Sequence, residues 1–149
     1  MAKGYPDWFG YSLFPKYGTV TTISVDNVVP VADWTEIVAL TGKGQIFGGA
    51  LDITNLNTNR NAAAEIRVQL DGTTILNTDL RSFYRRWKVF KHRMFPVFFV
   101  YLDGREYETI MQIDHDWTYE LSYRIDMINN NPFAGAINVY GRLFYYRVV

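Results

Sequence analysis

The sequence predicts an all-β domain, an antiparallel, jelly-roll-like β-sandwich, on the strength of three observations. Short runs of alternating apolar and polar residues recur along the chain, with turn residues between them. Two Asp-Gly pairs, Asp71-Gly72 and Asp103-Gly104, are the residues that tight type I′ hairpin turns need. Aromatic residues make up 17% of the 149 residues, and strands favour such side chains. An immunoglobulin-like sandwich is the alternative, although the chain lacks the cysteines of its Cys-Trp-Cys pattern.

A chain of this length is expected to form one domain, and its first residues indicate an extended N-terminal arm. We predict the arm at residues 1–33 and the β-sandwich domain at residues 34–149. Pro6, Pro15 and Pro30 each fix φ and remove a backbone donor, which suits a segment that lies on a surface.

The predicted strands follow the arm in order, separated by turns or polar loops. Gly48 and Gly49 predict a bulge or a close approach of two backbones. The runs 95–102 and 136–146 are apolar on both faces, which indicates strands covered on both sides. The strand-like runs are 34–40, 45–53, 64–76, 95–113, 117–128 and 136–149. The runs 64–76 and 95–113 each contain an Asp-Gly turn.

Two runs alternate most clearly. In the first, Ala64, Ile66, Val68 and Leu70 are predicted to face one way, and Glu65, Arg67 and Gln69 the other way. In the second, Trp117, Tyr119, Leu121, Tyr123, Ile125 and Met127 lie on one side, and Thr118, Glu120, Ser122, Arg124 and Asp126 on the other. Residues 78–91 do not alternate, and either a short helix capped by Thr78 or Asp79 or a structured loop fits them.

Composition excludes several classes of protein. The formal net charge is zero, so no overall field attracts nucleic acid or anionic lipid. The absence of cysteine excludes disulfides and a thiol nucleophile, and fits synthesis in the cytoplasm. Neither a secretory signal nor a run of about 18 apolar residues is present, so no membrane association is expected.

Groups that could carry catalysis are few, and each fits a simpler role. Asp114-His115-Asp116 could bind a metal, but Asp is an ordinary turn residue between two strands. Glu106 and Glu108 could serve a glycosidase, but alternate glutamates also make a solvated strand face. The TGKG turn at 41–44 lacks the spacing of a phosphate-binding loop. We therefore expect no enzyme activity, no metal and no cofactor.

Residues 81–93 combine six of the fifteen Lys and Arg residues with aromatic side chains and contain no acid. Such a mixture suits a protein interface or a polyanion, although the zero net charge disfavours a dedicated nucleic-acid binder. A loop with solvated charges is the simpler interpretation. The candidate residues are Arg81, Arg85, Arg86, Trp87, Lys88, Lys91 and Arg93.

The segment GYPDWFGYSLFPKYGT, residues 4–19, concentrates six aromatic residues that a soluble protein must bury somewhere. The segment either wraps its own sandwich or lies across a neighbouring subunit, and we favour the neighbour. The predicted interface residues are Tyr5, Trp8, Phe9, Tyr11, Phe14 and Tyr17.

Together with the short alternating strands and the run GRLFYY at 141–146, this segment resembles small structural proteins of tailed bacteriophages, the capsid decoration, head-fibre and tail-associated proteins. The resemblance implies a non-enzymatic virion component synthesised in the host cytoplasm. It implies a homo-oligomer, expected to be a trimer, that contacts the major capsid protein or another virion protein. The alternative is a carbohydrate- or receptor-binding module that uses Trp8, Trp34, Trp87 or Trp117 as a platform.

Overall fold

The computed structural model describes residues 20–57, 64–80, 98–103, 106–113, 117–131 and 135–147. Within these ranges the chain forms ten strands. They are β1 (Thr21–Val28), β2 (Thr35–Thr41), β3 (Gly44–Asn57), β4 (Glu65–Leu70), β5 (Thr73–Asp79), β6 (Phe98–Asp103), β7 (Glu106–Gln112), β8 (Trp117–Tyr119), β9 (Ser122–Ile128) and β10 (Asn138–Arg147).

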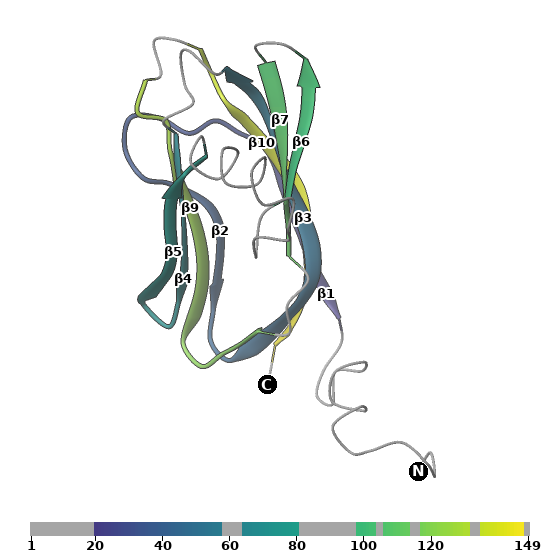
Figure 1. The fold of residues 1–149 in the computed structure, drawn as a ribbon. Coiled ribbons are helices and arrows are strands. Elements are labelled where there is room, and N and C mark those ends of the chain that lie inside the picture. Colours follow the sequence, from purple (N-terminus) through teal and green to yellow (C-terminus); the bar gives the residue numbers. More distant parts are fainter. Residues whose placement is uncertain are drawn as a thin grey trace.

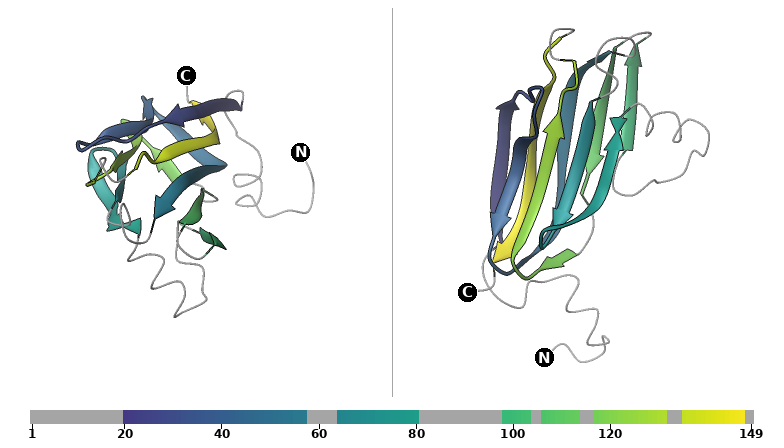
Figure 2. Two further views of the ribbon diagram at one scale, coloured as in Figure 1. Left: turned by 90° about the horizontal axis from the view of Figure 1, so that it is seen from above. Right: turned by 90° about the vertical axis from the view of Figure 1, so that its left-hand side faces the viewer.

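The strands make two antiparallel sheets that face each other. The large sheet has the order β1-β10-β3-β7-β6, with β8 paired to β3, and the small sheet has the order β2-β9-β4-β5. In Figure 1 the small sheet lies on the left and the large sheet on the right, and Figure 2 shows the same two layers from two further directions. The predicted antiparallel sandwich is confirmed.

The strand pairs are nested along the chain. β1 pairs with β10, β2 with β9, β3 with β7 and β4 with β5, and successive pairs alternate between the two sheets. A single antiparallel ribbon folded over in this way is a jelly roll, to which β6 and β8 are additions. An immunoglobulin domain pairs its strands in a different order, so that alternative is excluded.

Side chains from both sheets fill the space between them. The alternation of β4 is as predicted, because Ala64, Ile66 and Val68 are all buried. Other fully buried residues of this core are Ile46, Leu51, Ile53, Met111, Ile125, Met127 and Leu143.

The Asp71-Gly72 turn and the glycine features are confirmed as well, whereas Asp103 of the second Asp-Gly pair belongs to β6 and pairs with Glu106 instead of standing at the centre of a turn. Asp71 and Gly72 have φ angles of 49° and 78°, which a type I′ turn requires at both central residues. β3 bulges at Phe47, because Phe144 of β10 pairs with Gly48 and the next residue of β10 pairs with Ile46. A Cβ atom on Gly49 would lie 2.8 Å from the Cα of Leu143, so the two backbones approach closely there.

Two expectations differ from the structure. The run 117–128 is not one strand: β8 lies in the large sheet and β9 in the small sheet, and the chain bends between them at Leu121, which is 70% exposed. Residues 21–28, placed in the arm, form β1 and pair with β10 at an edge of the large sheet. Residues 1–19 of the arm lie outside the described residues, as do residues 81–91 of the predicted helix or loop.

The bend between β8 and β9 is held by the carboxylate of Asp71. Its Oδ1 accepts hydrogen bonds from the backbone N–H groups of Glu120, Leu121 and Ser122, at 3.0, 2.7 and 3.0 Å. The N–H of Asp71 in turn donates to the carbonyl of Ser122 at 2.8 Å. The hydrogen bonds from the three backbone N–H groups lower the pKa of Asp71 below its ordinary value of 3.8, and the one from Ser122 has the largest effect.

We predict that Asp71→Asn lowers the melting temperature at pH 7, since asparagine keeps the turn conformation but removes the charge. Because the pKa is lowered on folding, the stabilisation is present above pH 3.8 and is lost as pH falls through the lower pKa of the folded state. Thermal melts of both proteins between pH 7 and pH 2 check this. Equal melting temperatures at pH 7 would contradict it.

Candidate functional site

The structure describes few of the residues that the sequence marks as candidates. The arm aromatics, the basic stretch 81–93 and the turn 114–116 all lie outside the described residues. Glu106 and Glu108 fall on β7, where only their backbone is described. Of the four tryptophans, Trp34 and Trp117 are described, and Trp117 packs partly buried against the core.

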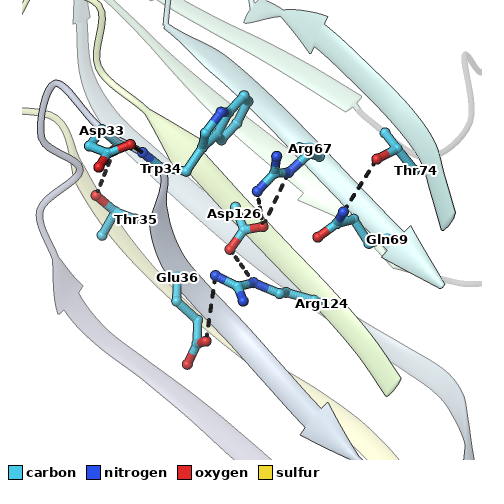
Figure 3. A network of polar contacts seen from close by, with 9 residues as sticks. All are labelled: Asp33, Trp34, Thr35, Glu36, Arg67, Gln69, Thr74, Arg124 and Asp126. Atoms are coloured by element: carbon cyan, nitrogen blue, oxygen red, sulfur yellow. Dashed lines mark hydrogen bonds and ion pairs between the residues drawn. The ribbon is translucent and has the colours of Figure 1, made fainter. Parts of the chain in front are cut away.

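A cluster of charges occupies the outer face of the small sheet. Ile125 and Met127 of β9 point into the core, so Asp126 between them points outward, yet its side chain is 0% exposed. Figure 3 shows it between two arginines, Arg67 from the neighbouring strand β4 and Arg124 from β9 itself. We call Glu36, Arg67, Arg124 and Asp126 the ion network.

The ion network is joined by hydrogen bonds and one longer ion pair, with nitrogen–oxygen distances from 2.5 to 3.7 Å. Arg67 donates to Oδ2 of Asp126 from Nε at 3.2 Å and from Nη2 at 2.8 Å. Arg124 donates from Nε to Oδ1 at 2.5 Å, and its Nη2 lies 3.7 Å from Oε2 of Glu36. Both oxygens of the buried carboxylate are therefore bound by guanidinium groups, which offsets the cost of removing its charge from water.

Trp34 covers one side of this network. The guanidinium carbon of Arg67 lies 4.2 Å from the centroid of the Trp34 ring, a cation–π contact. The residue before it, Asp33, accepts a hydrogen bond from the N–H of Trp34 at 2.7 Å, and the hydroxyl of Thr35 donates to the carbonyl of Asp33 at 3.2 Å. These local bonds fix the chain just before β2 and hold the ring over Arg67.

The chemistry available to the ion network is limited. Hydrogen bonding to Asp126 raises the pKa of Arg124, so the group keeps its proton. The charges of the two arginines balance those of the two acids. Both oxygens of Asp126 already accept hydrogen bonds, so this carboxylate is poorly placed to take a proton from a substrate. The network stabilises the sheet, and its exposed rim is Trp34, Glu36 and Arg124.

The core holds two phenols with no polar partner. The hydroxyl oxygens of Tyr119 and Tyr123 are buried without a hydrogen bond, and their rings lie 6.4 Å apart. Burial raises the pKa of both phenols, which keeps them protonated at neutral pH.

The outer face of the large sheet differs from that of the small one, because aromatic residues are exposed on it. Tyr140 and Phe144 of β10 are each 38% exposed, and Phe47 of the bulge lies 6.4 Å from Phe144 between ring centroids. Arg142 is exposed between the two aromatic residues of β10. We call Phe47, Tyr140, Arg142 and Phe144 the aromatic face.

A row of asparagines crosses three strands beside the aromatic face. Asn138 of β10 donates to Oδ1 of Asn27 at 2.6 Å, and Asn55 of β3 donates to Oδ1 of Asn138 at 2.7 Å. The hydroxyl of Tyr140 also donates to Oδ1 of Asn27, at 3.0 Å. The polar end of Tyr140 is thus bound within the chain, while its ring remains partly exposed.

No protein-family model matches the chain, and no curated protein matches it. Among the described residues, no three His, Asp or Glu side chains come together where they could hold a metal ion. The described part of the chain also contains no helix that is long and apolar enough to span a membrane.

Sequence reasoning did not predict the ion network. The alternation correctly places Arg67, Arg124 and Asp126 on the outer face, but it cannot show that two strands distant in sequence bring them together. The one local signal is the spacing of Arg124 and Asp126, which puts both on the same face of β9.

We predict that Arg67→Met lowers the free energy of unfolding by about 2 kcal/mol, because the buried carboxylate of Asp126 loses one of its two cations. Glu36→Gln is the matched control, and it should change stability by less than about 0.5 kcal/mol because Glu36 is largely exposed. Urea unfolding at pH 7 measures both. Equal effects of the two substitutions would contradict the ranking.

Proposed function

We propose that this protein is a non-enzymatic structural subunit of a virus particle, which coats or cements a capsid as an oligomer, expected to be a trimer. Its partners are other copies of the chain and the major capsid protein or another virion protein. The aromatic segment 4–19 and the basic stretch 81–93 supply contacts to neighbours, and the virion is where the protein acts. Nucleic acid and membranes are not among the partners.

The aromatic face is the observation that supports this proposal most. Tyr140 and Phe144 remain partly exposed on a sheet face whose strands were predicted to be covered on both sides. Interfaces between proteins are enriched in aromatic residues and arginine, and the face carries both. The jelly roll adds support as an analogy of fold, because viral capsid domains often have it.

The ion network supports a role without catalysis. Asp126 is the one fully buried acid among the described residues, and both its oxygens are bound by arginines. A general acid or base needs a proton-transfer position that a substrate can reach, and this carboxylate offers none.

We predict that the chain co-purifies with virus particles through a density gradient at a copy number comparable to that of other structural proteins. Deleting residues 2–19 should reduce that copy number several-fold while the melting temperature stays within a few degrees. Quantitative mass spectrometry of gradient-purified particles measures the first and a thermal melt the second. Particles without the chain would exclude the proposal, and unchanged incorporation of the truncated chain would exclude the role of the arm.

A carbohydrate- or receptor-binding module is the second candidate, and Trp34 favours it. Its partly exposed ring, held over Arg67, lies beside the exposed Glu36 and Arg124. An aromatic ring with charged hydrogen-bonding groups beside it is a common platform for sugars, and lectins also use the jelly roll.

If this second candidate is correct, Trp34→Ala should abolish binding to a glycan array while Tyr140→Ala, which removes an exposed ring from the other sheet, leaves it intact. A thermal melt must show that both variants are folded. No binding by the unchanged protein, or binding lost equally in both variants, would remove this candidate.

A further inference from the structure

We infer that the outer face of the large sheet binds the same face of a second copy of this chain, with β10 of each copy lying over β3 of the other. This inference deepens the proposed structural function and rests on it. It identifies the surface through which copies join, whereas the proposed function concerns incorporation into a particle.

The two central strands of the large sheet carry side chains of opposite size on this face. β10 presents Tyr140, Arg142 and Phe144, and the residues of β3 paired with them are Asp52, Ala50 and Gly48 in that order. The side chains of β10 therefore form a large row, and the paired side chains of β3 form a small row beside it. Two such faces fit together when the large row of one copy meets the small row of the other.

The space above the small row is open at one end. Apart from its two chain neighbours, the nearest atom of the described residues to a Cβ atom on Gly48 would be the carbonyl oxygen of Ile113, at 4.0 Å. Gly48 pairs directly with Phe144 in the sheet, so the open space lies at the height of that exposed ring. A phenyl ring from a second copy would lie over this glycine, beside the ring of Phe47.

Charges on the same face are also complementary. Oδ1 of Asp52 is buried and has no hydrogen-bond partner, and no hydrogen bond or ion pair joins Arg142 to another described residue. Asp52 and Arg142 lie on adjacent strands, one residue pair apart along the face. Asp52 as a whole is only partly buried, so a guanidinium from a second copy would bind its other carboxylate oxygen, and the exchange is mutual because each copy supplies both groups.

A two-fold axis parallel to the strands, between β10 and β3, satisfies all these contacts at once. It puts Phe144 of one copy over Gly48 of the other, because the two residues are paired at one height. Arg142 then reaches Asp52 of the other copy, one pair further along. Such a contact joins copies in twos, and between trimers it would link one trimer to the next.

Association through a face is favoured over association through a strand edge. The four strands that end the two sheets, β1, β6, β2 and β5, each show a shift in pairing register against their neighbour. Such irregular edges discourage the pairing of one chain's edge with another's. The zero net charge removes the repulsion that would otherwise oppose contact between identical faces.

Charge reversal in the full-length chain tests the inference. Arg142→Glu and Asp52→Arg should each weaken self-association by about tenfold or more, measured by sedimentation velocity over a concentration series. An equal mixture of the two changed chains should restore it, because each interface then contains only opposite charges. Rescue by mixing would show that Arg142 of one chain pairs with Asp52 of another. A chain that carries both substitutions would not show this, because its two changed residues could pair within one chain.

Shape is tested by Phe144→Ser, which should weaken self-association similarly, with Leu121→Ser as a control that removes an exposed apolar residue at the bend between β8 and β9. Thermal melts must show that all four variants fold. A wild-type chain that stays monomeric, single variants that associate normally, or a mixture that fails to recover would each overturn the inference. If such a result accompanies normal incorporation into particles, the proposed function stands and this interface alone is wrong.

Discussion

The pairing of β3 with β10 is the constraint on which the rest of this structure depends. β3 is the longest strand and also pairs with β7 and β8, while β10 connects it to β1. Two glycines allow the close approach on the core side: a Cβ on Gly49 would lie 2.8 Å from the Cα of Leu143, and one on Gly141 would lie 2.8 Å from Cδ2 of Leu51. The same pairing aligns the small and large rows on the outer face, so one register determines both the core and the aromatic face.

The two outer faces of the sandwich differ in the side chains that cover them. On the small sheet, charges neutralise one another, and a tryptophan covers part of them. On the large sheet, an asparagine row orders one end, and the aromatic rings beside it are left partly uncovered. The first arrangement is complete within one chain, whereas the second is the one through which we infer that a second copy binds.

Sequence patterns predicted most features that depend on neighbours in the chain. The alternation of β4, the type I′ turn at Asp71-Gly72 and the glycine bulge of β3 follow from local stereochemistry. The break at Leu121 was hidden because alternation continues through it, and its cause is a carboxylate 50 residues away in the chain. The burial of Asp126 was hidden for the same reason, since Arg67 lies 59 residues from it. Patterns within one strand do not reveal contacts made across strands.

The nested pairing also has a consequence for the order of events during synthesis. Within the part of the chain that the structure describes, β1 is the first strand and has β10 as its only partner in the large sheet, and β10 is made after the other nine strands. β1 must wait for residues more than a hundred positions later, so this closure is a slow, non-local step of folding. Because the aromatic face is built largely from β10, a nascent chain lacks it until translation has passed that strand. Unfinished chains therefore lack the face through which we infer that copies of the chain join.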